Sequence, residues 1–129
     1  MTSVAHPKKI LVVDDDADGA QSTASVLRSL GHSASAITDS RAVLPGVLRD
    51  KPDIVLLDIG MPHMNGYEVA KALKGKFPGV YVVAVTAYEG AEYRQRGREA
   101  GFDAYLVKPV DISMLESVLA TLFAPRAVR

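Results

Sequence analysis

Four short runs of apolar residues stand out along the chain, and each is continuous rather than alternating with polar positions. They cover residues 10–13, 54–57, 80–85 and 105–107, and they are rich in Val and Ile. Such runs are typical of strands that are buried on both faces of a parallel sheet. With a weaker candidate from Ser33 to Ile37, the pattern predicts five strands.

Helical stretches lie between these strands. The predicted helices run from about Asp18 to Leu30, from a cap at Asp39, from after Asn65 to near Phe77, from about Ala91 to Ala100, and from after Asp111. Pro45 falls inside the second of them and predicts a kink or a shortened helix there. The regular alternation predicts an α/β fold, with helices on both faces of a five-stranded parallel sheet.

Composition narrows the possible partners and the domain organisation. The chain has 129 residues, which suits a single domain, and we expect it to span residues 9–123 between tails at 1–8 and 124–129. Lys plus Arg and Asp plus Glu both number 15, so bulk charge favours neither nucleic acid nor an anionic membrane as a direct partner. The absence of Cys excludes a disulfide framework. With no apolar run long enough to span a membrane, we expect a cytoplasmic protein.

Polar residues follow four of the predicted strands. They are Asp14 and Asp15 after the first, Asp58 after the third, Thr86 after the fourth and Lys108 after the fifth. The carboxyl ends of parallel strands open on one edge of a sheet, where ligands bind. We therefore expect these side chains to meet at one site.

The residue types at this edge suit phosphoryl transfer. Clustered carboxylates are the ligands that Mg²⁺ prefers, and an Asp carboxylate can act as a nucleophile that forms an aspartyl phosphate. A Lys ammonium and a Thr hydroxyl can bind phosphoryl oxygens. Neighbouring strands lie about 4.8 Å apart, so Asp58 reaches Asp14 and Asp15 only if the first and third strands are adjacent. This requirement selects the flavodoxin-like strand order 2-1-3-4-5, a (βα)5 three-layer sandwich.

The motifs at these strand ends resemble the receiver domains of two-component response regulators. They are the segments 10–15 (ILVVDD), 57–62 (LDIGMP) with Asn65-Gly66, 85–87 (VTA) and 105–109 (YLVKP), and the resemblance covers about residues 8 to 123. It implies a phosphoacceptor signalling domain rather than an enzyme, one that supports its own phosphorylation and autodephosphorylation. Its expected donor is a sensor histidine kinase or a histidine phosphotransfer protein, and its expected target is an unknown downstream protein.

The same resemblance assigns roles to individual residues. It implies that Asp58 accepts the phosphoryl group and that Thr86 and Lys108 bind the phosphoryl oxygens. It implies that Asp15, Asp58 and the backbone carbonyl of Gly60 ligate Mg²⁺, with Asp14 acting through water. Tyr105 matches an aromatic residue that changes rotamer together with Thr86, which alters the face formed by the fourth helix, fifth strand and fifth helix. It also implies a cis Lys108–Pro109 peptide bond.

Rival functions follow from parts of the same pattern. Asp14-x-Asp16 after an apolar strand also resembles the nucleophile motif of haloacid-dehalogenase-like phosphatases, which leaves Asp58 without a role. A flavodoxin-like flavin binder would need a phosphate-binding loop rich in Ser, Thr and Gly after the first strand, and this chain has no such loop there. An EF-hand starting at Asp14 would need a Glu at its twelfth position, which is Ser25.

Two further groups of residues are predicted to lie on the surface without a role. The histidines His6, His32 and His63 show no spacing typical of metal ligands. The arginines of the fourth helix are interspersed with glutamates, which predicts a solvated helix face at Arg94, Arg96 and Arg98.

Overall fold

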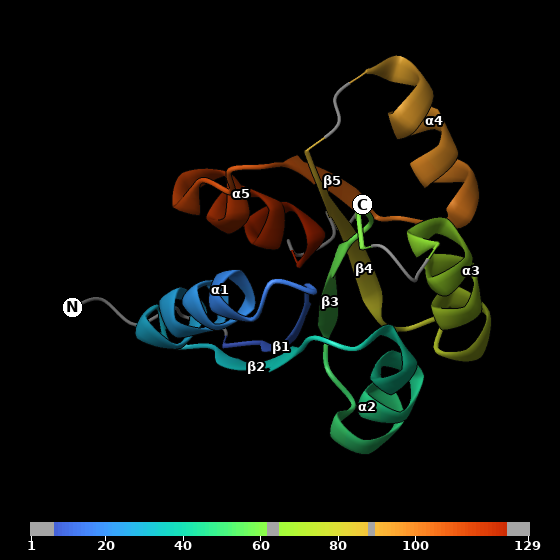
Figure 1. The fold of residues 1–129 in the computed structure, drawn as a ribbon. Coiled ribbons are helices and arrows are strands. Elements are labelled where there is room, and N and C mark those ends of the chain that lie inside the picture. Colours follow the sequence, from blue (N-terminus) through green and yellow to red (C-terminus); the bar gives the residue numbers. More distant parts are fainter. Residues whose placement is uncertain (1–6, 62–64, 88–89, 124–129) are drawn as a thin grey trace, which may run out of the picture.

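Five parallel strands form one sheet in the order β2-β1-β3-β4-β5 in the computed structural model, which describes residues 7–61, 65–87 and 90–123 (Figure 1). The strands are β1 (Lys9–Val13), β2 (Ser33–Ile37), β3 (Ile54–Asp58), β4 (Tyr81–Thr86) and β5 (Ala104–Val107). The predicted flavodoxin-like order is therefore confirmed, including the adjacency of β1 and β3 that the site required.

Helices cover both faces of the sheet, as the alternation predicted. The helices α1 (Ala17–Ser29) and α5 (Ile112–Leu122) lie on one face (Figure 1). The other face carries α2 (Val43–Asp50), α3 (Gly66–Lys76) and α4 (Ala91–Ala100). Within the described residues, no helix has the length and apolar character needed to cross a lipid bilayer.

Each face of the sheet contributes to its own hydrophobic core. In β1, Leu11 and Val13 pack toward α2 and α3, whereas Ile10 and Val12 pack toward α1 and α5. All four side chains are at most 4% exposed. Burial on both faces explains why the apolar runs in the sequence are continuous.

The region around Pro45 shows how the chain accommodates a proline near a helix. Asp39 caps a short 3-10 helix, Ser40–Ala42, by accepting a hydrogen bond from the backbone N–H of Arg41. The α-helix begins only at Val43, so Pro45 lies in its first turn, where backbone N–H groups lack intrahelical partners. The helix is shortened at its start, which is one of the two outcomes that the sequence predicted.

The start of α3 is fixed by two adjacent residues. Asn65 caps the helix, and its side-chain oxygen accepts hydrogen bonds from the backbone N–H groups of Tyr67 and Glu68. Gly66 packs so closely against Ile59 that a Cβ at position 66 would lie 2.5 Å from Ile59 Cγ2 and 2.8 Å from its Cα. The Asn-Gly pair therefore packs α3 tightly against the segment that follows β3.

The prediction for His32 is wrong, and the other two histidines lie outside the described residues. His32 is only 7% exposed, and its Nδ1 accepts a hydrogen bond from the backbone N–H of Lys8 at 2.9 Å. Burial lowers the pKa of His32, which keeps the imidazole neutral and able to accept this bond. His32 therefore ties the start of β1 to the start of β2.

Candidate functional site

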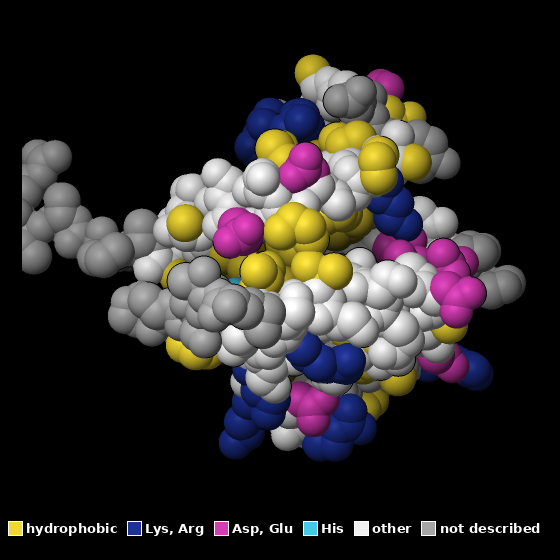
Figure 2. Space-filling view, turned by 90° about the vertical axis from the view of Figure 1, so that its left-hand side faces the viewer, with side chains coloured by type: hydrophobic (Ala, Val, Ile, Leu, Met, Phe, Trp, Pro, Cys, Tyr) yellow, Lys and Arg dark blue, Asp and Glu magenta, His cyan; other side chains and the backbone are white. Residues whose placement is uncertain are grey.

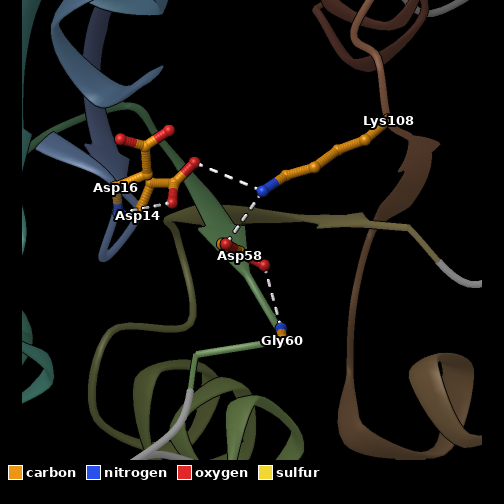
Figure 3. Close-up of polar contacts among 5 residues, drawn as sticks. All are labelled: Asp14, Asp16, Asp58, Gly60 and Lys108. Carbon is orange, nitrogen blue, oxygen red and sulfur yellow. Dashed lines mark hydrogen bonds and ion pairs between the residues drawn. The ribbon is translucent and has the colours of Figure 1, made fainter. Parts of the chain in front are cut away.

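The predicted site residues meet at the carboxyl edge of the sheet. Asp58 is the last residue of β3, and Asp14 and Lys108 directly follow β1 and β5 (Figure 3). Side chains alternate along a strand, so Asp58 lies on the same side as Leu56, toward α1 and α5. Asp14 lies on this side too, two residues after Val12. The fold thus directs both carboxylates into the same space.

Three carboxylates at this edge could hold a metal ion together. Asp14, Asp15 and Asp58 each offer an oxygen, and these oxygens all lie within 4.8 Å of one another. The three differ in exposure, since Asp58 is buried, Asp14 is half-buried and Asp15 is exposed. A hard divalent cation such as Mg²⁺ takes carboxylate oxygens and retains several waters, so one exposed ligand suits it. The residues present therefore fit the expected metal.

The positive charge of Lys108 compensates the negative charge of two of these carboxylates. Its Nζ lies 2.9 Å from Asp58 Oδ2 and 3.4 Å from Asp14 Oδ2 (Figure 3). Burial opposes the charged form of Lys108, but its hydrogen bond and ion pair with Asp58 outweigh this effect and raise its pKa above the ordinary value. Lys108 is therefore a fixed positive charge at the centre of the site.

Backbone amides orient the two inner carboxylates. Gly60 N donates to Asp58 Oδ1 at 2.9 Å, and Asp16 N donates to Asp14 Oδ1 at 3.0 Å. Burial raises the pKa of Asp14; the hydrogen bond from Asp16 opposes this effect, and the neighbouring charge of Asp58 adds to it. The sequence motifs did not predict that Gly60 positions Asp58 through its N–H. The expected role of the Gly60 carbonyl as a Mg²⁺ ligand stays a prediction.

Thr86 ends β4, the strand beside β3, and Tyr105 lies on β5, where it packs against the core under α2, α3 and α4. Thr86 is fully buried at the end of β4, and its side chain forms a hydrogen bond with the Tyr105 side chain. The Tyr105 pKa is raised, chiefly by burial. The peptide bond between Lys108 and Pro109 is cis, as the sequence motif implied, and Lys108 N donates to Thr86 O at 2.7 Å.

A cavity of about 520 Å³ extends from the carboxylates between α1 and the segment that joins β5 to α5. Asp14, Asp58 and Lys108 line one end, and the apolar side chains of Val12, Leu56 and Val85 line the part toward the sheet. Figure 2 shows hydrophobic side chains in a hollow on this side of the molecule. The candidate site is therefore accessible from the side of α1 and of the segment that joins β5 to α5.

The arginines of α4 are exposed, as predicted, but they are not simply solvated. The guanidinium of Arg94 lies 5.2 Å from the centre of the Tyr105 ring, and that of Arg96 lies 4.3 Å from the centre of the Tyr67 ring. Both contacts join residues far apart in the sequence, so the periodicity of α4 alone could not have indicated them.

Comparison with known families supports the interpretation of these motifs. The model of the response regulator receiver domain matches residues 10–120. The response regulator MprA of Mycolicibacterium vanbaalenii is 36% identical over 92% of this chain and 50% of its own length. The DNA-binding response regulator MtrA of Mycobacterium leprae is 40% identical over 79% of this chain and 45% of its own length. The chain thus spans about half the length of these curated relatives.

Solved structures share the same fold. A response regulator receiver protein from Burkholderia phymatum is 32% identical, with a TM-score of 0.78 over 96% of this chain and 100% of its own. The chemotaxis protein CheY4 of Vibrio cholerae is 26% identical, with a TM-score of 0.85 over 92% of this chain and 100% of its own. Both likenesses extend over nearly the whole fold described above.

Proposed function

The chain belongs to the response regulator receiver family, and on that basis we propose that Asp58 is the residue that accepts the phosphoryl group. The observation that supports this assignment is the position of its carboxylate. Asp58 lies 2.9 Å from the Lys108 ammonium and beside two further carboxylates, at the end of a central strand. Its Oδ1 is held by Gly60 N, which orients the group.

In the proposed reaction, one Asp58 oxygen attacks phosphorus in a phosphohistidine of the donor. A phosphorus–oxygen bond forms to Asp58 while the phosphorus–nitrogen bond breaks. The bonding electron pair leaves with the imidazole, which takes up a proton. Lys108 stabilises the transferred group, because its ammonium can pair with a phosphoryl oxygen instead of an Asp58 oxygen.

We propose that Asp15, Asp58 and the carbonyl of Gly60 hold Mg²⁺, with Asp14 acting through water. The chemistry that Mg²⁺ supplies when bound is charge screening between the Asp58 carboxylate and the incoming phosphoryl oxygens. The support for this site is the approach of three carboxylates within 4.8 Å.

Thr86 connects the acceptor to Tyr105 in the proposed switch. The Thr86 hydroxyl has a single proton, and its side chain is hydrogen-bonded to Tyr105 in this structure. A phosphoryl group on Asp58 would offer Thr86 a charge-assisted hydrogen bond, which contributes about 1.5–3 kcal/mol. Once Thr86 turns toward the phosphoryl group, Tyr105 loses this partner and changes position. The α4-β5-α5 face then changes shape for a partner to recognise.

The roles outside this domain are also proposals. The phosphodonor is a sensor histidine kinase or a histidine phosphotransfer protein, and the downstream target is a protein that binds the α4-β5-α5 face. We place this signalling in the cytoplasm and expect the domain to support its own dephosphorylation. The comparisons give no support to a haloacid-dehalogenase-like phosphatase that uses Asp14, since the family match covers residues 10–120 as a receiver domain.

Intact mass spectrometry tests the acceptor assignment. Incubation with acetyl phosphate and Mg²⁺ is expected to add one phosphoryl group to the wild-type chain and none to Asp58→Asn, which retains the size and shape of the side chain. Asp53→Asn is a matched control, since Asp53 caps β1 by accepting a hydrogen bond from Lys9 N at 2.8 Å and has no role in the reaction. Full labelling of Asp58→Asn would exclude Asp58 as the acceptor.

The switch is tested with beryllofluoride, a stable mimic of the phosphoryl group. Thr86→Ala is expected to bind the mimic but to show much smaller NMR shift changes around Tyr105 than the wild type. Equal shift changes in the two proteins would refute the coupling between Thr86 and Tyr105 while leaving Asp58 as the acceptor.

A further inference from the structure

Helix α4 buries only small residues against the rest of the fold. Its buried residues are Gly97 and Ala100, so the helix contributes no large apolar side chain to the core. Aromatic rings from its neighbours fill this role instead. A Cβ at Gly97 would lie 3.4 Å from the Phe102 ring and 3.5 Å from the Tyr105 ring. The outer side of α4 is therefore left to polar and charged residues.

Two arginines of α4 line a hollow beside these rings. Arg94 and Arg98 lie four residues apart, which places them on one side of the helix, one turn from each other. With Phe102 and Tyr105 they line a hollow of about 200 Å³. Figure 2 shows Lys and Arg side chains gathered near the top of the molecule, at the height of α4 in Figure 1. The hollow thus combines aromatic walls with two guanidinium groups.

Asp103 also lines the hollow, but an ion pair with Lys74 compensates the charge of its carboxylate. Asp103 accepts hydrogen bonds from Lys74 Nζ at 3.0 Å and from Val82 N at 2.9 Å. Glu99 accepts a hydrogen bond from Gln95 at 3.1 Å. Across residues 7–61, 65–87 and 90–123, no carboxylate forms an ion pair with Arg94 or Arg98. Arg98 donates a hydrogen bond to Gln95 Oε1 at 2.6 Å, but this partner is neutral, so neither guanidinium charge is compensated by a carboxylate among these residues.

We propose that this hollow is a docking site for a protein segment that presents two carboxylates about one helical turn apart, with an apolar side chain between them. The carboxylates would pair with Arg94 and Arg98, and the apolar side chain would enter the hollow between Phe102 and Tyr105. The inference rests on the proposed role of the α4-β5-α5 face in signalling, and it adds the chemistry of the partner.

The charge pattern of α4 favours a short acidic protein segment over a nucleic acid. Glu92 precedes the arginines and Glu99 follows them, so positive charge extends over little more than one turn. A nucleic acid carries a phosphate at every nucleotide, and its neighbouring phosphates would approach these glutamates. A protein segment can confine its negative charge to two positions that match the arginines.

The partner would also sense the state of Tyr105. Arg94 lies 5.2 Å from the centre of the Tyr105 ring, and this ring forms a wall of the hollow. When Tyr105 changes position, Arg94 loses its contact with the ring and the hollow changes shape. Phosphorylation of Asp58 would therefore alter the affinity for the acidic segment.

An NMR titration of the full chain with short synthetic peptides tests the docking site. The acidic probe carries two glutamates four residues apart with a leucine between them, and its control has glutamine in place of both glutamates. A single-stranded thymidine oligonucleotide is the nucleic acid probe. The protein variants are Arg94→Gln with Arg98→Gln, and the matched control Arg41→Gln with Arg49→Gln, which removes two exposed arginines from the α2 region.

The acidic peptide is expected to shift the amide signals of Gly97, Phe102 and Ala104 saturably, and beryllofluoride is expected to change its affinity. Replacing both glutamates, or Arg94 and Arg98, is expected to weaken binding about fivefold, as for two exposed ion pairs. The Arg41 and Arg49 variant is expected to bind as the wild type does.

Three outcomes would overturn the proposal: equal binding of the two peptides, stronger binding of the oligonucleotide at α4, or no saturable shifts at millimolar acidic peptide. The comparison of the two peptides uses the wild-type protein, so it does not depend on how well the arginine variants fold. Failure of the proposed acceptor would be visible separately, as labelling of Asp58→Asn in the mass experiment.

Discussion

Lys108 pairs with two of the carboxylates that we propose as Mg²⁺ site residues, and this leads to a prediction about Lys108→Met. The Lys108 ammonium lies 2.9 Å from Asp58 Oδ2 and 3.4 Å from Asp14 Oδ2, and both carboxylates belong to the candidate metal site. The substitution removes the charge while keeping an unbranched side chain of similar length. We expect the variant to be less stable than the wild type without metal and to bind Mg²⁺ more tightly.

The magnitudes follow from the geometry. Losing the ammonium leaves two carboxylates that repel each other, but the Lys108 side chain is 35% exposed, so solvent screens part of the effect. We expect a loss of about 1–2 kcal/mol in the free energy of unfolding. The repulsion between a divalent cation and an ammonium about 4 Å away, at a dielectric near that of water, is about 2 kcal/mol. Removing it corresponds to about 30-fold tighter Mg²⁺ binding.

Urea unfolding with and without chelator measures the stability, and isothermal titration calorimetry measures the Mg²⁺ affinity. Lys74→Met is the matched control, because Lys74 forms an ion pair with Asp103 at 3.0 Å outside the acidic cluster. It is expected to lose stability without any change in Mg²⁺ affinity. If Lys108→Met binds Mg²⁺ no more tightly than the wild type, the proposed competition between ammonium and metal is refuted.

Three further predictions concern the metal, the pH dependence and the packing of α3. Asp15→Ala is expected to lose Mg²⁺ affinity in calorimetry yet to melt no lower than the wild type in metal-free buffer, because it removes one of three mutually repelling carboxylates; unchanged affinity would contradict the ligand assignment. The pKa of the buried His32 is lowered in the folded state, so the unfolded chain takes up this proton first as the pH falls. Stability should therefore decrease as the pH drops below about 6.5. In melting curves, His32→Asn, which keeps an acceptor near the Nδ1 position, should lose this part of the decrease. Gly66→Ala would place a Cβ 2.5 Å from Ile59 Cγ2 and should cost about 1–3 kcal/mol in urea unfolding. Gly75→Ala in the same helix meets nothing within 4 Å and should be neutral or stabilising.

The sequence predicted the sheet well because its three central strands are buried on both faces and four of its strands lead into polar residues. The strand order could be predicted because the chemistry of Asp58 required a neighbour that carries Asp14 and Asp15. The positions of helix starts were also predictable where a side chain caps the helix, as at Asn65 and Asp111. These features depend on neighbours in the sequence or on a single functional requirement.

The features that the sequence did not reveal depend on contacts between distant segments. His32 is polar and isolated in the sequence, and it is buried only because the start of β1 supplies a donor from Lys8. Arg94 and Arg96 follow the pattern of a solvated helix face, but tyrosines from β5 and α3 lie beneath their guanidinium groups. A helix with so few apolar residues gives no local sign of what holds it in place.

The weak attachment of α4 and the position of Thr86 together explain how a small energy could control a surface. Thr86 is fully buried at the end of β4, and its hydrogen bond with Tyr105 leads from the proposed phosphoacceptor site to the ring beneath Arg94. A charge-assisted hydrogen bond to a phosphoryl group contributes about 1.5–3 kcal/mol, which shifts a two-state equilibrium by a factor of about 10 to 150. A helix anchored by large buried side chains would need more energy to move. Each such side chain would leave a cavity in the core, which costs about 2–5 kcal/mol. Since α4 buries only Gly97 and Ala100, we expect the energy of one such hydrogen bond to be enough to shift its position in the proposed switch.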